Sequence, residues 1–198
     1  MKAAQVIGSD GISGVPHAMR IYALRNIILP HYSADKNISE LIVVGEWEPG
    51  EGYTYIKCPS VHFSSVDALK QRQVGFEAST GDVVIHSHDD HILAPDWATC
   101  LDSRADILIP QRWTRLRHSF GEVLNNGEPT PQDPRGYVSG HCAVYKREVL
   151  ERCPWSMVPA IRTWDMQATR LYDDAGFKIV RSQTLRCYDT EFGSSPWA

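Results

Sequence analysis

Runs of apolar residues alternate along this chain with segments in which apolar positions recur every three or four residues. Runs bounded by glycine, proline or polar residues predict strands, and the spaced pattern predicts helices. We expect strands at residues 3–7, 41–44, 53–58, 83–85, 107–109, 137–145 and 177–180. We expect helices at residues 15–29, where Pro30 should end the helix, and at residues 65–78, 146–152 and 163–175, with another starting at Pro95. Strands that alternate with helices predict an α/β fold with a mostly parallel central sheet flanked by helices.

Residues 111–136 are rich in proline and glycine, and we expect them to form a long loop. Long loops inside compact domains usually serve a function. The first part of this stretch places Arg112, Arg115 and Arg117 around Trp113. Arginines interleaved with an aromatic ring suit contact with nucleic-acid phosphates and bases. Pairing of the same arginines with nearby acids on a solvated surface is the alternative explanation.

Composition narrows the possible classes of protein. The chain has 198 residues and a formal net charge of −4, which suits one domain and gives no general attraction to nucleic acid or anionic membranes. Its 5 cysteines form no CxxC pair, which favours a reducing compartment over a disulfide framework. We find no signal peptide and no apolar run of about 18 residues, so we expect a cytoplasmic protein without a membrane span.

Metal-capable side chains are concentrated in one short segment. Three histidines and two aspartates fall within residues 86–91, directly after the expected strand at 83–85. Open α/β sheets bind their ligands at the carboxyl ends of their strands. The segment is therefore the first candidate for a functional site.

Several stretches of the chain resemble a family-2-like glycosyltransferase of the GT-A fold, in order and in spacing, over most of residues 3–190. These are residues 41–44, Arg72-Gln73-Val74-Gly75, residues 81–97, Gly140 followed by residues 146–151, and Trp164-Asp165 followed by residues 170–179. The resemblance implies one GT-A (Rossmann-like) domain over residues 1–198, with a nucleotide-sugar-binding half at 1–90 and an acceptor-side half at 91–198. It also implies sugar transfer from a nucleotide-sugar, with a UDP-sugar as the first expectation, to an acceptor hydroxyl.

The resemblance assigns a Mn²⁺ or Mg²⁺ ion to the acidic segment. Such a cation neutralises the leaving diphosphate, and one or two carboxylates hold it while phosphates complete its shell. Asp90 aligns with the last position of the family's Asp-x-Asp motif, His91 could supplement it, and Asp189 stands near the place of the family's late histidine. The residues expected to contact the nucleotide-sugar are Asp10, Glu46, Arg72, His88 and Asp89.

Asp165 aligns with the family's general base, which takes the proton of the acceptor hydroxyl. Acids are also common at helix starts, where they complement the helix dipole. Gly140, His141 and Trp164 are expected on the acceptor side. Arg112, Arg115 and Arg117 add the possibility of a nucleic-acid acceptor, such as a hydroxymethylated base of phage-type DNA modified in a host cytoplasm. A sugar, a lipid-linked molecule or a protein is the family's usual acceptor, and a homodimer could complete the acceptor site.

Two other interpretations stay open at this point. Residues 86–91 also match His-x-His-x-Asp-His, the dinuclear metal motif of metallo-β-lactamase-like hydrolases, although that fold needs a β-rich first half and a later histidine. A non-catalytic nucleotide-sugar-binding module would keep the donor residues and lack the base.

Overall fold

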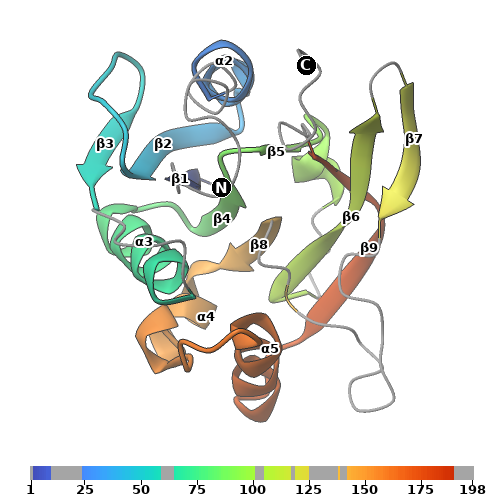
Figure 1. Ribbon diagram of the computed structural model, residues 1–198. Helices are drawn as coiled ribbons and strands as arrows, with labels where there is room; N and C mark the ends of the chain where they lie inside the picture. The colour runs from blue at the N-terminus through green and yellow to red at the C-terminus, as the bar shows by residue number, and fades with distance from the viewer. Residues whose placement is uncertain are drawn as a thin grey trace.

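The computed structural model describes residues 2–9, 24–58, 65–100, 105–116, 119–124, 138 and 142–189. These residues form one nine-stranded sheet in the order β3-β2-β1-β4-β8-β6-β9-β5, with β7 paired to β6 (Figure 1). Strands β3, β2, β1 and β4 are parallel, β8 is antiparallel to both β4 and β6, and β9 is again parallel to β6. The predicted α/β fold is confirmed, with a parallel first half of the sheet and a mixed second half.

Most elements follow the chain in the order expected from the sequence, and two strands, at residues 91–93 and 119–124, were not expected. The strands are β1 (Ala3–Ser9), β2 (Ile38–Gly45), β3 (Thr54–Lys57), β4 (Val83–His88), β5 (His91–Leu93), β6 (Ile107–Leu116), β7 (Ser119–Leu124), β8 (Cys142–Lys146) and β9 (Ile179–Asp189). The helical elements are a π-helix η1 (Leu24–Ile28), α2 (Leu29–Ala34), α3 (Ser65–Ala78), a 3₁₀ turn η2 (Trp97–Cys100), α4 (Arg147–Arg152), a second 3₁₀ turn η3 (Trp155–Met157) and α5 (Trp164–Asp174). None of the helices in the described ranges is long and apolar enough to cross a membrane.

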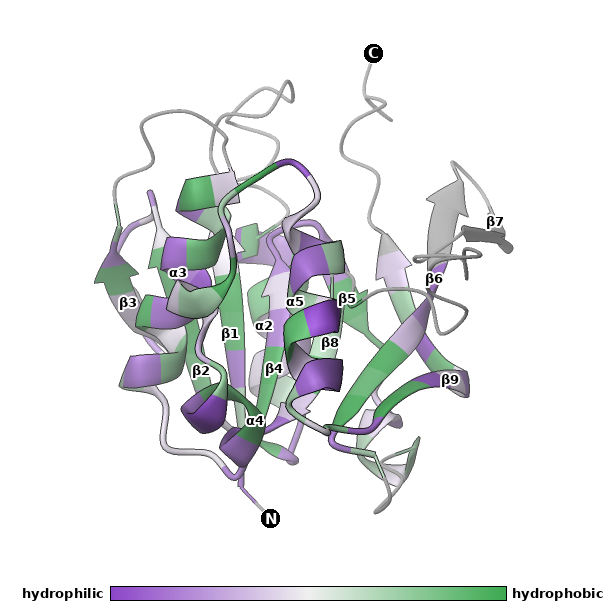
Figure 2. Ribbon diagram, turned by 90° about the horizontal axis from the view of Figure 1, so that it is seen from below, coloured by the Kyte–Doolittle hydropathy of each residue, from purple (hydrophilic) through white to green (hydrophobic). Residues whose placement is uncertain are grey.

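Helices cover both faces of the sheet, which explains the continuous apolar runs of its central strands. Helix α2 lies on one face, and α3, α4 and α5 lie on the other (Figure 1). Alternate residues of β4 accordingly enter different cores: Val83 and Ile85 pack toward η1 and α2, and Val84 packs toward α3, α4 and α5. Figure 2 shows mostly green, hydrophobic stretches in these central strands, behind helices α3, α4 and α5, whose visible surfaces carry many purple, hydrophilic residues. This alternation places His86 and His88 on the α3 side of β4.

Two glycines permit close contacts that the site depends on. A Cβ at Gly75 of α3 would lie 2.2 Å from a side-chain carbon of Val6, so this glycine lets α3 approach β1. Gly45, at the end of β2, has a φ of +137°, and a Cβ there would lie 2.2 Å from the backbone oxygen of Ser9. Both positions therefore favour glycine, the second also because of its left-handed backbone conformation.

Three local predictions were wrong. The expected loop at residues 111–136 begins as a strand, because β6 continues to Leu116 between β9 and β7, and β7 adds a hairpin partner. Pro30 does not end a helix. It lies in the first turn of α2, where its missing N–H leaves no helical hydrogen bond unmade. Pro95 precedes only the 3₁₀ turn η2.

Candidate active site

The carboxyl ends of β1, β2 and β4 meet at one edge of the sheet. The register pairs Ser9 with Gly45 and Gly8 with His88, so the segment after β2 and the turn after β4 both lie beside the end of β1. Glu46 follows directly and is partly buried. The side-chain amide of Gln71 in α3 donates a hydrogen bond of 3.2 Å to the backbone oxygen of Ser9, which fixes the helix against this edge.

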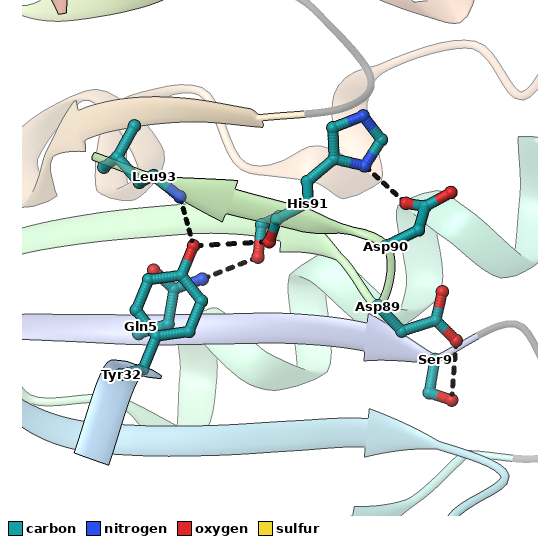
Figure 3. A network of polar contacts seen from close by, with 8 residues as sticks. Gln5, Ser9, Tyr32, Asp89, Asp90, His91 and Leu93 are labelled. Atoms are coloured by element: carbon teal, nitrogen blue, oxygen red, sulfur yellow. Dashed lines mark hydrogen bonds and ion pairs between the residues drawn. The ribbon is translucent and has the colours of Figure 1, made fainter. Parts of the chain in front are cut away.

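The two aspartates of the turn point in different directions (Figure 3). Asp89 is 1% exposed and accepts a hydrogen bond of 3.1 Å from the hydroxyl of Ser9. The side chain of Asp90 is 26% exposed, and its carboxylate contacts Nδ1 of His91, a ring that is 1% exposed. Asp89 therefore braces the turn, and Asp90 presents a carboxylate that a ligand can reach.

Strand β5 is fixed on both sides, which sets the position of His91. The hydroxyl of Tyr32 donates to the backbone oxygen of His91 at 3.4 Å and accepts from the backbone N–H of Leu93 at 2.9 Å (Figure 3). On its other edge, β5 pairs with β9 so that His91 lies opposite Asp189. The fold thus brings together the backbones of Asp90, His91 and Asp189, three residues expected to bind metal. The side chain of Asp189 lies outside the described part.

The turn after β4 offers a carboxylate that could take part in holding a divalent metal ion. Within the described ranges, no three His, Cys, Asp or Glu side chains are grouped so that they could hold a metal ion. Mg²⁺ and similar ions are commonly held by one or two carboxylates, with substrate phosphates and water in the remaining positions. The partly exposed carboxylate of Asp90, oriented by the buried ring of His91, fits that kind of site.

A second group of candidate site residues surrounds the start of α5. Asp165 is partly buried, and one of its carboxylate oxygens accepts a hydrogen bond of 2.9 Å from the N–H of Met166. Burial raises the pKa of the Asp165 carboxyl, and the N–H of Met166 and the charge of Arg72 partly oppose that effect. A carboxylate whose proton affinity is raised above that of ordinary aspartate is suited to accept a proton.

Arg72 and Trp164 are in contact with each other. The guanidinium carbon of Arg72 lies 5.2 Å from the ring centroid of Trp164 and 5.4 Å from that of Trp155. Arg72 also lines a cavity of about 10 Å³, together with Gly8 and His88 at the strand ends. A cavity of this size holds about one water molecule. Arg72 therefore lies between the strand edge and the start of α5.

His86 belongs to the core and not to a metal site. Its ring is 1% exposed and lies 5.5 Å from the ring of Tyr145 and 5.4 Å from that of Trp155, between centroids. Burial, helped by the charge of Arg72, holds the pKa of His86 well below its usual value. His88 is partly exposed, and its ring lies 6.2 Å from that of His91. With His86 enclosed by aromatic rings, the metallo-β-lactamase-like motif loses its first ligand, and the parallel first half of the sheet does not favour that fold.

Several predicted site residues fall outside the described part: Asp10, Arg117, Gly140 and His141, with the side chain of Arg115. Arg112 lies on β6 and is partly buried, so it belongs to a strand and not to the loop expected from the sequence. Sequence reasoning missed Ser9, Gln71 and Trp155. Ser9 ends the first strand and could have been found from that position, whereas no local pattern links Trp155 to Arg72.

The fold recurs among solved structures. The mannosyltransferase PcManGT from Pyrobaculum calidifontis, in complex with GDP-Man and Mn²⁺, matches with a TM-score of 0.56 and 14% identity, over 94% of this chain and 56% of its own. GalNAc-T7 with UDP, GalNAc and Mn²⁺ matches with a TM-score of 0.58 and 14% identity, over 98% of this chain and 46% of its own. A CMP:2-keto-3-deoxy-manno-octonic acid synthetase complexed with CTP matches with a TM-score of 0.55 and 15% identity, over 91% of this chain and 89% of its own.

These similarities establish the fold. The chain has the GT-A fold, and it spans about half the length of the two transferases. No protein-family model matches the sequence, and no curated protein matches it.

Proposed function

We propose that this chain is a glycosyltransferase that moves a sugar from a nucleotide-sugar to an acceptor hydroxyl with the help of a divalent cation. The observation that carries the proposal is the position of Arg72, which lines a cavity with His88 at the strand ends and acts through its charge on Asp165. Asp90 stands at the sheet edge where such folds bind nucleotides, and Asp165, with its raised pKa, stands at the start of α5. Residues 1–90 would supply most of the donor side, and residues 91–198 most of the acceptor side.

Asp90, supplemented by His91 and Asp189, would hold Mn²⁺ or Mg²⁺, which when bound offsets the negative charge of the donor diphosphate. Arg72 and His88 line the cavity next to this edge and would contact the phosphates or ribose. Glu46 and Asp10 would contact the nucleoside, for which uridine is the first candidate. Asp89 would act mainly through Ser9, by fixing the turn that carries Asp90.

Asp165 would remove the proton of the acceptor hydroxyl. The acceptor oxygen then bonds to the anomeric carbon of the sugar, while the bond from that carbon to the diphosphate oxygen breaks. The diphosphate leaves with the bonding electron pair, and the acceptor proton resides on Asp165. This is a direct displacement, so it predicts inversion at the anomeric carbon. Gly140, His141 and Trp164 are the proposed acceptor-side residues.

No contact among the described residues identifies the acceptor. A hydroxymethylated DNA base stays a prediction that depends on Arg112, Arg115 and Arg117. The placement of Arg112 on a strand removes the loop argument for that acceptor and leaves the argument from charge.

A thermal-shift panel tests the proposal. UDP-, GDP-, CMP- and TDP-sugars and CTP are each added with Mn²⁺ or with EDTA. A donor at 100 times its Kd stabilises the folded state by about 2.7 kcal/mol. We expect one nucleotide-sugar to stabilise the protein only with Mn²⁺. When acceptors are added, it should then release a nucleoside diphosphate, or CMP if a CMP-sugar is the donor. Pyrophosphate release from CTP would instead identify a nucleotidyl-transfer enzyme, and metal-dependent binding without any product would identify a binding module.

A further inference from the structure

Two indole rings from different parts of the chain enclose the guanidinium group of Arg72. Trp155 comes from η3 and Trp164 from the first turn of α5, and their ring centroids lie 5.9 Å apart with planes at 80°. The guanidinium carbon is within 5.5 Å of both centroids, at 5.4 and 5.2 Å. Arg72 is only 4% exposed. A cation over an indole face is held more tightly when it is desolvated, so both contacts restrain this side chain.

A cluster of buried rings holds Trp155 in place. Its ring centroid lies 5.4 Å from that of His86, 5.5 Å from that of Tyr145 and 6.0 Å from that of Tyr172. All four side chains are buried. The indole nitrogen of Trp155 has no hydrogen-bond partner within the described part of the chain. Ring packing, and not a hydrogen bond, therefore fixes the indole beside Arg72.

Arg72 is next to two parts of the proposed site. On one side it lines the small cavity with Gly8 and His88, at the ends of β1 and β4. On the other side its charge acts on Asp165, which directly follows Trp164. One buried cation thus lies between the edge proposed to bind the donor and the acid proposed to act as base.

We propose that Trp155 and Trp164 are positioning residues, which clamp Arg72 so that its charge serves the donor edge and Asp165 together. The catalytic consequence rests on the proposed function, whereas the clamp itself rests on the contacts. Lysine could supply the same charge but not the planar, delocalised guanidinium group that lies over the two indole rings. The clamp therefore explains why an arginine, enclosed by two tryptophans, occupies this position.

The clamp has a measurable electrostatic effect. Burial raises the pKa of Asp165, and the charge of Arg72 lowers it. Among the described residues, Arg72 is the charged group that lowers the pKa of this carboxyl, and the backbone N–H groups of Met166 and of Asp165 itself lower it as well. If the clamp is opened, Arg72 gains freedom to move away, and the pKa of Asp165 should rise.

The test is an NMR titration of the Asp165 carboxyl carbon in the full chain, with ¹³C-labelled aspartate. We expect the Asp165 midpoint to move to higher pH in Trp155→Leu, and to return part of the way in Trp155→Phe, which keeps an aromatic face. Tyr172→Phe is the matched control, because it removes a hydroxyl from the same cluster but keeps the ring, and it should leave the midpoint unchanged. In transfer assays, Trp155→Leu should move the acid limb of the kcat profile to higher pH and lower kcat at acidic pH, by roughly tenfold for each pH unit that the limb moves.

An unchanged Asp165 midpoint in a folded Trp155→Leu protein would overturn the clamp, even if that variant were less stable. If Trp155→Leu does not fold, Arg72→Lys replaces it, since this variant keeps the charge and loses the planar guanidinium group, and the midpoint should again rise. The titration requires no activity. A wild-type protein that transfers no sugar would refute the proposed function and leave the result of the titration standing.

Discussion

The hydroxyl of Ser9 donates a hydrogen bond of 3.1 Å to the carboxylate of Asp89, across 80 residues of sequence. Both side chains are buried, at 3% and 1% exposure. The contact joins the end of β1 to the turn after β4, and the next residue of that turn is Asp90. Ser9 is therefore a support for the proposed metal ligand, although it would touch neither metal nor donor.

Ser9→Ala should destabilise the protein by about 1–3 kcal/mol, because it removes a buried hydrogen bond to a charged group. Urea unfolding measures the change. Ser39→Ala is the control: Ser39 is exposed, and its hydroxyl donates to the backbone oxygen of Ala3 at 3.0 Å. It should cost roughly 0.5 kcal/mol or less, as surface substitutions usually do. Equal losses of unfolding free energy in the two variants would show that the contact between Ser9 and Asp89 stabilises the protein no more than an exposed serine hydrogen bond does.

Asp165→Asn should lower kcat by about 10²- to 10⁴-fold, the usual contribution of a general base. The Kd of the donor should change little, because the proposed role of Asp165 is toward the acceptor. The base works only when it is deprotonated, and burial raises its pKa. Wild-type kcat should therefore rise with pH through a midpoint above that of ordinary aspartate. Asp174→Asn, at the exposed end of α5, is the control, and it should retain both rate and pH profile. An Asp165→Asn protein with the wild-type rate would reduce Asp165 to a helix-start residue.

The buried ring of His86 should make the fold sensitive to acid. Its pKa is held well below the usual value in the folded protein, whereas in the unfolded chain it titrates near about 6.5. As the pH falls below about 6.5, the unfolded chain binds a proton that the folded protein does not, so the free energy of unfolding decreases. This loss continues until the pH reaches the lowered pKa of the folded state.

His86→Phe keeps an aromatic ring against Tyr145 and Trp155 but cannot titrate. Its free energy of unfolding should fall less steeply than that of the wild type between pH 6.5 and the lowered folded pKa, by at most about 1.4 kcal/mol per pH unit. Urea unfolding at a series of pH values measures both slopes. Parallel curves would mean that His86 is protonated in the folded protein.

A nucleic-acid acceptor predicts salt-dependent binding. If Arg112, Arg115 and Arg117 contact phosphates of a B-form duplex, the log–log slope of affinity against salt should be about −0.9 for each contact. Replacing all three with alanine should make the slope shallower by roughly two to three units and leave donor binding unchanged. Acceptor affinity that does not vary with salt would exclude a nucleic-acid acceptor but not the proposed sugar transfer.

Periodicity predicted the fold well where both sheet faces are buried. The run before His86 is apolar because both faces of β4 are buried. Gly75 is a glycine because α3 approaches Val6 closely at that point. Residues 111–116 were predicted poorly, because their strand depends on two partners. One is β9, where Gln111 pairs with Arg186, and the other is β7, which forms a hairpin with β6. Local composition carries no record of such partners.

For the site, the resemblance suggested roles for Asp90, His91 and Asp165 that stay predictions, and the sequence could not separate the roles of neighbouring residues. Asp89 and Asp90 differ in burial because the turn directs one toward Ser9 and the other outward. His86 matched a metal motif as well as His88 did, and only the rings of Tyr145 and Trp155 show that it is enclosed. These differences between neighbouring residues come from contacts with distant segments of the chain.

Paramagnetic broadening by Mn²⁺ tests the central claim most directly. Amide signals of the full chain are recorded with the nucleotide-sugar selected by the thermal-shift panel, before and after addition of Mn²⁺. Signals of residues 88–92 and of Ser9 should broaden first, and Asp90→Ala should abolish this effect. Asp96→Ala, which removes an exposed carboxylate from the same region, should not abolish it. Broadening centred away from the turn after β4, or the same pattern in Asp90→Ala, would contradict a donor and metal site at this edge.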